Sequence, residues 1–209
     1  MKSALVWDVE FLTDAGAPQR FWCGPRDPDP VLAQIGAVRL GLEGDFPLLD
    51  RFERIVVPRD RAGAIWPLSP LMTRLTGISD ARLAAEGVEL EPALMALAGF
   101  AGDDTIWAWG NDEIFAVGIS CYLAGVAPPL PATQFGNATR LLVKAGVPEA
   151  EVITLRSNTL CAHFGVDDAG AQAHDALGDA QSVAYVLQHF LRSGALSAED
   201  FAHDRGAAA

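Results

Sequence analysis

The chain has 209 residues, and 50% of them are hydrophobic, which is enough for one sizeable core and excludes a disordered or fibrous protein. Its 27 acidic residues outnumber 15 basic ones, and the net charge of −12 argues against a broad nucleic-acid footprint. This charge is still compatible with binding to a few phosphate groups, because divalent cations would reverse the local charge. Three cysteines without a CxxC pair exclude a disulfide framework and a structural zinc site.

The apolar segments indicate a soluble, cytoplasmic protein. Asp8 and Glu10 interrupt the first apolar run too early for a secretory signal peptide. The longest mostly apolar stretch, residues 114–127, is too short to cross a bilayer. We therefore expect a cytoplasmic location and no membrane partner.

Three strands are expected at the start of the chain. Residues 4–11 and 31–42 form largely apolar runs, and residues 52–57 end in β-branched side chains. A turn at Gly44 between the second and third runs predicts an antiparallel meander. From residue 69 onward the apolar spacing becomes helical, and glycines break the pattern into short pieces.

The second half of the chain is expected to alternate between strand and helix. A strand is predicted over residues 105–109, and helices over residues 113–123, 140–145 and 176–191. The last helix is the longest and carries its apolar residues on one face. Strands followed by this alternation favour an α/β fold, with a mixed sheet flanked by helices.

One domain is expected over residues 1–195, followed by a C-terminal tail over residues 196–209. The proline-rich segment 128–131 is predicted to be a loop, because too little chain lies on either side for two separate cores. Residues 205–209 have nothing to bury, so we expect them to fray.

Two acids stand near the end of the first predicted strand. Residues two apart in a strand point to the same side, so Asp8 and Glu10 would place two carboxylates next to each other. Hard oxygen ligands of this kind suit Mg²⁺ or Mn²⁺. The alternative interpretation is an edge strand with solvated acids.

A histidine and two acids begin the longest predicted helix. Asp175 can cap the helix, which leaves His174 just outside it and Asp179 one turn inside. A histidine side chain titrates near neutral pH and can act as a general base beside a metal. The alternative is an ordinary loop histidine followed by a solvated helix residue.

Taken together, the two motifs resemble the first and third motifs of the DEDDh group of 3′-to-5′ exonucleases. This group has a ribonuclease H-like fold and includes the proofreading subunit of DNA polymerase III, ribonuclease T and the oligoribonucleases. Residues 75–79 also look like the group's Thr-Gly-Ile turn, and residues 160–166 look like its Leu-Cys-x-x-Phe-Gly-Ile stretch. The resemblance spans about residues 4–192 and implies a five-stranded mixed sheet with helices on both faces.

The second exonuclease motif matches less closely. Aligning Trp109-Gly110-Asn111 with the group's Trp-Gly-Asn-Gly-x-x-Phe-Asp pattern places the expected aspartate on Ala116. If the segment is shorter, Asp112 takes the role instead. We prefer Asp112, since a carboxylate at the start of a helix is favoured by the helix dipole. Its alternative interpretation is an ordinary helix cap without a metal.

The resemblance implies a two-metal hydrolysis of phosphodiester bonds from a free 3′ end, releasing nucleoside monophosphates. Asp8, Glu10 and Asp179 would hold the ion that carries the attacking water, and Asp8 would bridge to a second Mg²⁺ or Mn²⁺. Asp112 would support that second ion, and His174 would deprotonate the water. Two alternatives stay open. One is a binding module that does not cut nucleic acid, which is favoured if Ala116 stands at the aspartate position of the second motif. The other is a phosphohydrolase of small nucleotides.

The expected partner is the 3′ end of a single-stranded nucleic acid. Phe11 and Trp109 flank the motif acids and are predicted to stack on a terminal base, although aromatic residues more often pack in a core. The choice between DNA and RNA stays open, because it depends on contacts with the 2′-hydroxyl. Relatives that work as dimers make a homodimer a further expectation.

Overall fold

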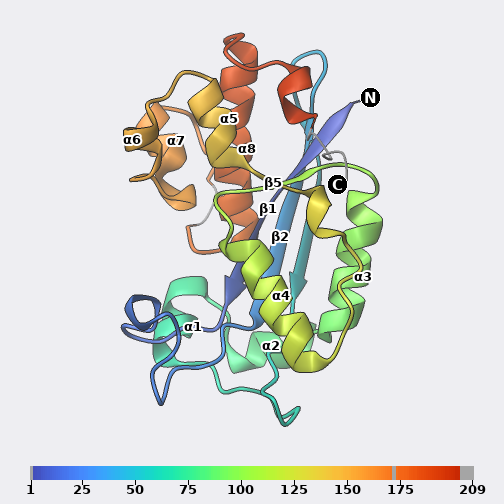
Figure 1. Cartoon of the computed structure of the whole chain (residues 1–209), viewed down its shortest axis with the longest axis vertical. Coiled ribbons are helices and arrows are strands. Elements are labelled where there is room, and N and C mark those ends of the chain that lie inside the picture. The colour runs from blue at the N-terminus through green and yellow to red at the C-terminus, as the bar shows by residue number, and fades with distance from the viewer. Residues whose placement is uncertain (1, 171–172, 203–209) are drawn as a thin grey trace, which may run out of the picture.

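The centre of the molecule is a five-stranded mixed sheet, seen in a computed structural model that describes residues 2–170 and 173–202 (Figure 1). Its strands are β1 (Ser3–Phe11), β2 (Leu32–Gly41), β3 (Leu48–Ile55), β4 (Ile106–Ala108) and β5 (Phe135–Asn137). The first three form the predicted antiparallel meander, and β4 and β5 continue the sheet in parallel from the other edge of β1. The resulting order is β3-β2-β1-β4-β5.

The helices connect and cover these strands. The α-helices of the described residues are α1 (Pro70–Thr76), α2 (Asp80–Glu86), α3 (Leu90–Ala101), α4 (Asp112–Ala124), α5 (Ala138–Lys144), α6 (Glu149–Val152), α7 (Leu160–Phe164) and α8 (Ala176–Arg192). Short 3₁₀ turns are η1 (Pro18–Arg20), η2 (Ala132–Gln134), η3 (Ser157–Thr159) and η4 (Ala198–Phe201). Within the described part of the chain, none of the helices combines the length and apolarity that crossing a membrane requires.

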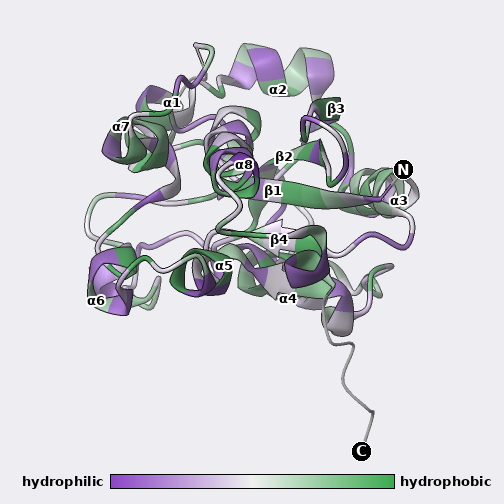
Figure 2. Cartoon of the chain, turned by 90° about the horizontal axis from the view of Figure 1, so that it is seen from above, coloured by the Kyte–Doolittle hydropathy of each residue, from purple (hydrophilic) through white to green (hydrophobic). Residues whose placement is uncertain are grey.

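The alternation of side chains along β1 gives the sheet two cores. Ala4 and Val6 point toward α8 and pack in one cluster with residues of that helix. Leu5 and Trp7 point the other way and pack with α3 and α4. Figure 2 shows α8 and α4 on opposite sides of β1. The side chains that follow Val6 on its own face, Asp8 and Glu10, therefore lie on the side covered by α8.

Two features differ from the sequence-based predictions. The fifth strand, β5, was not located, because its three residues Phe-Gly-Asn carry no alternating apolar pattern. The chain also continues in the core past the expected boundary at residue 195, where Leu196 and Phe201 are buried beside α8. A capping box between Ser197 and Asp200 orders this turn, and Phe201 packs edge-on against Trp107. The predicted fraying of 205–209 lies outside the described residues.

Candidate active site

Asp8 and Glu10 lie near the end of β1. Asp8 is only 8% exposed, and Glu10 is half-buried. The neighbouring strand β4 pairs with Leu5 and Val6 and ends at Ala108, so the chain turns away into α4 beside the acids. The predicted pair of carboxylates on one face is present and faces the start of α8.

The start of α8 supplies the third acid. Asp175 caps the helix by accepting a hydrogen bond from the backbone N–H of Gly178 at 3.1 Å, as its position in the sequence predicted. Asp179 lies one turn further and is 5% exposed. Its carboxylate accepts the backbone N–H of His174, while its Oδ1 atom has no hydrogen-bond partner within the described residues.

Two residues of β2 hold this end of α8 against the sheet. Gly36 pairs with Asp8 across the sheet, and a Cβ atom added at Gly36 would lie 2.1 Å from the backbone nitrogen of Leu177. Only glycine permits this approach. Buried Gln34 donates a hydrogen bond to Asp175 Oδ1 at 2.7 Å and accepts one from the backbone N–H of Ala176 at 3.2 Å. The two residues together set how near Asp179 comes to β1.

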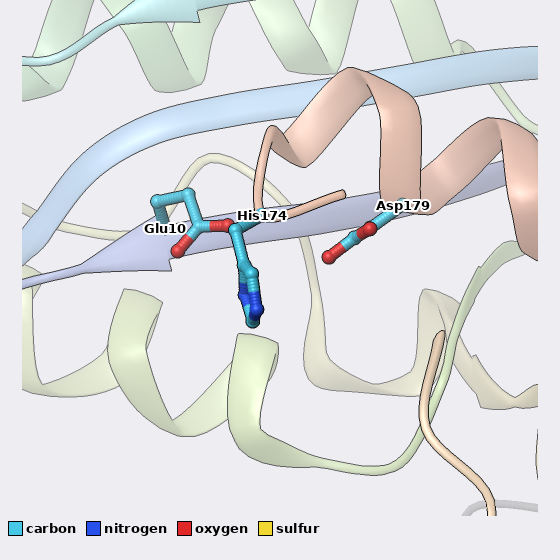
Figure 3. Close-up of side chains that lie close together, drawn as sticks. All are labelled: Glu10, His174 and Asp179. Carbon is cyan, nitrogen blue, oxygen red and sulfur yellow. The ribbon is translucent and has the colours of Figure 1, made fainter. Parts of the chain in front are cut away.

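His174 joins two of the acids in a compact cluster. Glu10, His174 and Asp179 each have a potential ligand atom within 4.8 Å of those of the others, and Figure 3 shows the three side chains converging from β1 and the start of α8. The backbone of His174 has a φ of 58°, a value uncommon outside glycine, and its side chain is exposed. The His174 Nε2 atom lies 3.3 Å from the amide nitrogen of Asn158.

The carboxylates of the site are buried close to one another, which favours their protonated forms. Burial, followed by the charges of Asp179 and Asp175, raises the pKa of Glu10 to about 8. Burial is also the main reason that the pKa of Asp179 rises to about 7. The pKa of Asp8 lies well above its usual value, because burial and the charges of Glu113, Asp179 and Glu10 all oppose ionisation.

Sequence reasoning missed one buried acid. Glu113, at the start of α4, is 5% exposed, and its Oε2 atom has no hydrogen-bond partner within the described residues. Among the charges that raise the pKa of Asp8, that of Glu113 is the largest. Asp112, the acid preferred from the sequence, has an exposed side chain. The signal for Glu113 was its spacing of three residues from Ala116, which places both on one side of a helix.

These acids fit a divalent cation. Asp179 and Glu113 each bury an unpartnered carboxylate oxygen, and no lysine or arginine of the described residues forms an ion pair with any of the four acids. Buried carboxylates of this kind cost free energy unless a cation compensates them. Oxygen-only clusters are the preferred ligands of Mg²⁺ and Mn²⁺.

A cavity of about 190 Å³ is lined by Glu113 and by none of the other three acids, and a larger one of about 440 Å³ lies away from all four. Glu113 and Arg140 line the smaller cavity together with Trp7 and Asn111. The predicted base-stacking residues are both partly buried. Phe11 packs against Trp22 with ring centroids 5.5 Å apart, and the Trp109 indole donates a hydrogen bond to the Leu155 carbonyl oxygen at 3.3 Å.

Neither a protein-family model nor a curated protein sequence matches this chain, but solved structures match its fold. A full-length 3′-exonuclease superposes with a TM-score of 0.70 at 17% identity, covering 92% of this chain and 61% of that protein. Exonuclease I from Methylocaldum szegediense gives a TM-score of 0.61 at 19% identity, covering 92% of this chain and 41% of that one. Escherichia coli exonuclease I, solved with a dT13 oligonucleotide, gives 0.60 at 15% identity, with coverages of 90% and 41%.

The comparisons confirm the predicted fold class. The molecule has the ribonuclease H-like fold of the 3′-exonucleases, with the five-stranded mixed sheet expected from the motifs. The chain spans about three fifths of the length of the first of these proteins and about two fifths of the exonuclease I chains.

Proposed function

We propose that this protein is a metal-dependent 3′-to-5′ exonuclease that hydrolyses phosphodiester bonds and releases nucleoside monophosphates. The observation that carries the proposal is a group of buried carboxylates for which the described residues provide no basic partner, on a fold shared with 3′-exonucleases. Fold alone does not determine activity, so the proposal depends on the acids and on His174.

Asp8, Glu10 and Asp179 would hold the Mg²⁺ or Mn²⁺ ions, as expected from the first and third motifs. The bound ions would lower the pKa of a water molecule and offset negative charge on the phosphoryl oxygens. The protein contributes a fixed position for each carboxylate, because β1 and the capped start of α8 are both anchored by buried contacts. Preorganised ligands of this kind need little rearrangement when ions bind.

His174 would accept the proton of the attacking water at a ring nitrogen. Its position next to Glu10 and Asp179 supports this role, since its ring would lie beside the ions that the two acids would hold. The contact with the Asn158 amide would help to hold the ring in place.

The proposed substrate is the 3′ end of a single-stranded nucleic acid. The E. coli enzyme has been solved with dT13 and dA16 oligonucleotides, which supports a single strand as the substrate here. Phe11 and Trp109 would stack on the terminal bases. The homodimer and the cytoplasmic location expected from the sequence remain predictions.

The first test is digestion of 5′-labelled single-stranded DNA and RNA with Mg²⁺ or Mn²⁺. We expect a ladder that shortens from the 3′ end of at least one polymer, is blocked by a 3′-phosphate, and is abolished by Asp8→Asn. No shortening of either polymer would contradict the proposal. Equal digestion by Asp8→Asn would assign the activity to a contaminating nuclease. Hydrolysis of small nucleotides alone would favour the phosphohydrolase instead.

A further inference from the structure

One side of α4 exposes apolar side chains. Phe115, Ile119 and Tyr122 are 65%, 36% and 85% exposed, and their spacing places them in a row along the helix. Gly118 lies in the same row, and the position of its missing side chain is open space. We call these four residues the α4 stripe. Of the described helices and strands, none covers the outer side of α4, which lies at the front of the molecule in Figure 1.

The α4 stripe differs from the scattered hydrophobic residues of an ordinary surface. Of the nine large hydrophobic side chains that the described residues expose, three belong to the stripe. Residues 114–139 also contain no acidic or basic residue, although 20% of the whole chain is charged. Single exposed hydrophobic residues are normal, whereas an exposed apolar group without charges is typical of the centre of a protein interface.

The charge of the chain indicates which partner the α4 stripe can accept. At a net charge of −12, two copies repel each other wherever acidic surfaces meet. Salt limits this repulsion to about 8 Å under physiological conditions, so copies can associate where the contact surface itself is neutral. The stripe is such a surface. A basic partner, in contrast, would find no acid within the stripe to bind.

The α4 stripe is also complementary to itself. A two-fold axis between Gly118 and Ile119 pairs two α4 helices antiparallel and brings Phe115 of each copy against Tyr122 of the other. Because Gly118 has no side chain, the two helices can approach closely at the axis. A parallel pair would instead place every residue, including Asp112, against its own counterpart.

The charged residues at the two ends of α4 favour the same arrangement. Asp112 begins the helix and is exposed. Arg61 lies near the other end, where it lines the 440 Å³ cavity with Leu123 and Ala124, and its side chain stays 74% exposed although it pairs with Asp29. Antiparallel pairing brings the Asp112 end of one copy to the Arg61 end of the other. Opposite charges at the rim of an interface fix its orientation more than its affinity.

We propose that the α4 stripe is a dimer interface, on which a second copy of this chain packs its own α4 antiparallel about a two-fold axis between Gly118 and Ile119. The exposed parts of Phe115, Ile119 and Tyr122 amount to roughly 350 Å² per copy. A standard interface buries about 800 Å² per partner, so the adjoining uncharged segment 124–129, most of which is exposed, contributes the rest. The dimer is therefore small and dissociates readily.

The first test is the mass of the whole chain in sedimentation equilibrium, from micromolar to millimolar concentration. We expect a reversible change from monomer to dimer. Tyr122→Asp should raise the dimer Kd at least about tenfold, the loss usual for a central aromatic residue. Met95→Asp is the control, since Met95 is 57% exposed on α3, and it should stay within about twofold of the wild type. Both variants should keep the wild-type Tm. A wild type that stays monomeric, or equal Kd values for the two variants, would overturn the proposal.

A mixing experiment tests the antiparallel register. Phe115→Glu and Tyr122→Lys should each dimerise more weakly than the wild type. An equimolar mixture should associate more tightly than either variant alone, because the introduced carboxylate of one copy faces the introduced ammonium group of the other. A mixture that associates no better than its components would exclude this register.

Cross-linking tests the position of the two-fold axis. In a Cys23→Ser background, which removes the exposed cysteine, Gly118→Cys should form a disulfide-linked dimer under mild oxidation. A disulfide needs Cα atoms about 4.4–6.8 Å apart, a distance that residues beside the axis can reach. Met95→Cys in the same background should stay monomeric. Equal cross-linking of the two variants would show random collision and overturn the proposed axis.

The interface does not depend on the proposed function. If the wild type dimerises through the α4 stripe but digests neither DNA nor RNA, the exonuclease is excluded and the interface stands. If the wild type digests nucleic acid but remains a monomer at every concentration, only the interface is excluded.

Discussion

The acids of this protein fall into two groups with opposite surroundings. On the surface, carboxylates meet guanidinium groups, as in the pair of Glu89 with Arg59 at 2.6 Å and the pair of Asp29 with Arg61 at 3.2 Å. In the candidate site, Asp8, Glu113 and Asp179 are almost fully buried and form no ion pair with a basic side chain of the described residues.

This difference indicates where a bound cation, and not a basic side chain, would compensate the charge of the acids. A surface carboxylate gains little from its partner, because water and salt already screen its charge. A buried one loses its hydration, and a neighbouring carboxylate adds repulsion. A cluster of such groups costs free energy in the metal-free protein, and a divalent cation recovers it on binding. The predictions below test this contrast, from the largest expected effect to the smallest.

The largest effect is expected for the residue that would move the proton. His174→Gln should lower kcat by about 100- to 10,000-fold, the range usual for loss of a general base. Its Mn²⁺ affinity should stay within about twofold of the wild type, as measured by calorimetry. A loss of affinity that matches the loss of activity would instead make His174 a metal ligand, which its distance from Glu10 and Asp179 also permits.

The buried acids should make metal-free stability fall as pH rises. Their pKa values of about 8 for Glu10 and about 7 for Asp179 exceed those in the unfolded chain, so the folded state binds more protons between pH 5 and 8. In EDTA, the free energy of unfolding should drop across this range by on the order of a few kcal/mol. Urea titrations at each pH measure it, and a flat profile would contradict the raised pKa values.

Mn²⁺ should reverse this trend. A proton and a metal ion compete for the same carboxylates, so Mn²⁺ affinity should increase as pH rises to about 8 and level off above it. Calorimetry in buffers of different ionisation enthalpy should also detect protons released on binding. Affinity that is independent of pH between 6 and 8 would show that these acids are not the ligands.

Gly36→Ala should disturb the site although it replaces none of the acids. The added Cβ would collide with the backbone of Leu177, and we expect a cost at the upper end of the ~1–3 kcal/mol typical of overpacked cores. Displacement of the start of α8 should also weaken Mn²⁺ binding. Gly99→Ala is the control, since it lies exposed on α3 with open space around it and should stabilise by roughly 0.5–1 kcal/mol. Equal changes in the free energy of unfolding for Gly36→Ala and Gly99→Ala would contradict the close contact between Gly36 and Leu177.

The smallest effect is expected for a partly exposed ion pair. Arg82 donates to Glu86 and Glu53, which are both accessible to water, so Arg82→Ala should change the free energy of unfolding by only about 0–1 kcal/mol. Mn²⁺ affinity should not change. A larger loss of stability in urea titrations would mean that removing Arg82 also disturbs Asp175, through the hydrogen bonds that Gln34 donates to Glu53 and Asp175.

Much of the site could be predicted from local sequence patterns. The period of two in a strand placed Asp8 and Glu10 on one face, and the capping preference of aspartate located the start of α8 at Asp175. Both rules act over a few residues, so they hold whatever the rest of the chain does. The meander of β1, β2 and β3 followed from the same short-range signals.

The tertiary structure decided which of the two acids at the start of α4 is buried. Asp112 and Glu113 are adjacent and equally compatible with a helix start, and only the packing of α4 against β1 makes one exposed and the other buried. The same holds for β5, whose three residues become a strand because β4 offers an unpaired edge. The sequence by itself determined the local geometry and the chemical types, because these depend on neighbouring residues. Burial and proximity depend on contacts between segments more than 100 residues apart, and only the folded chain establishes them.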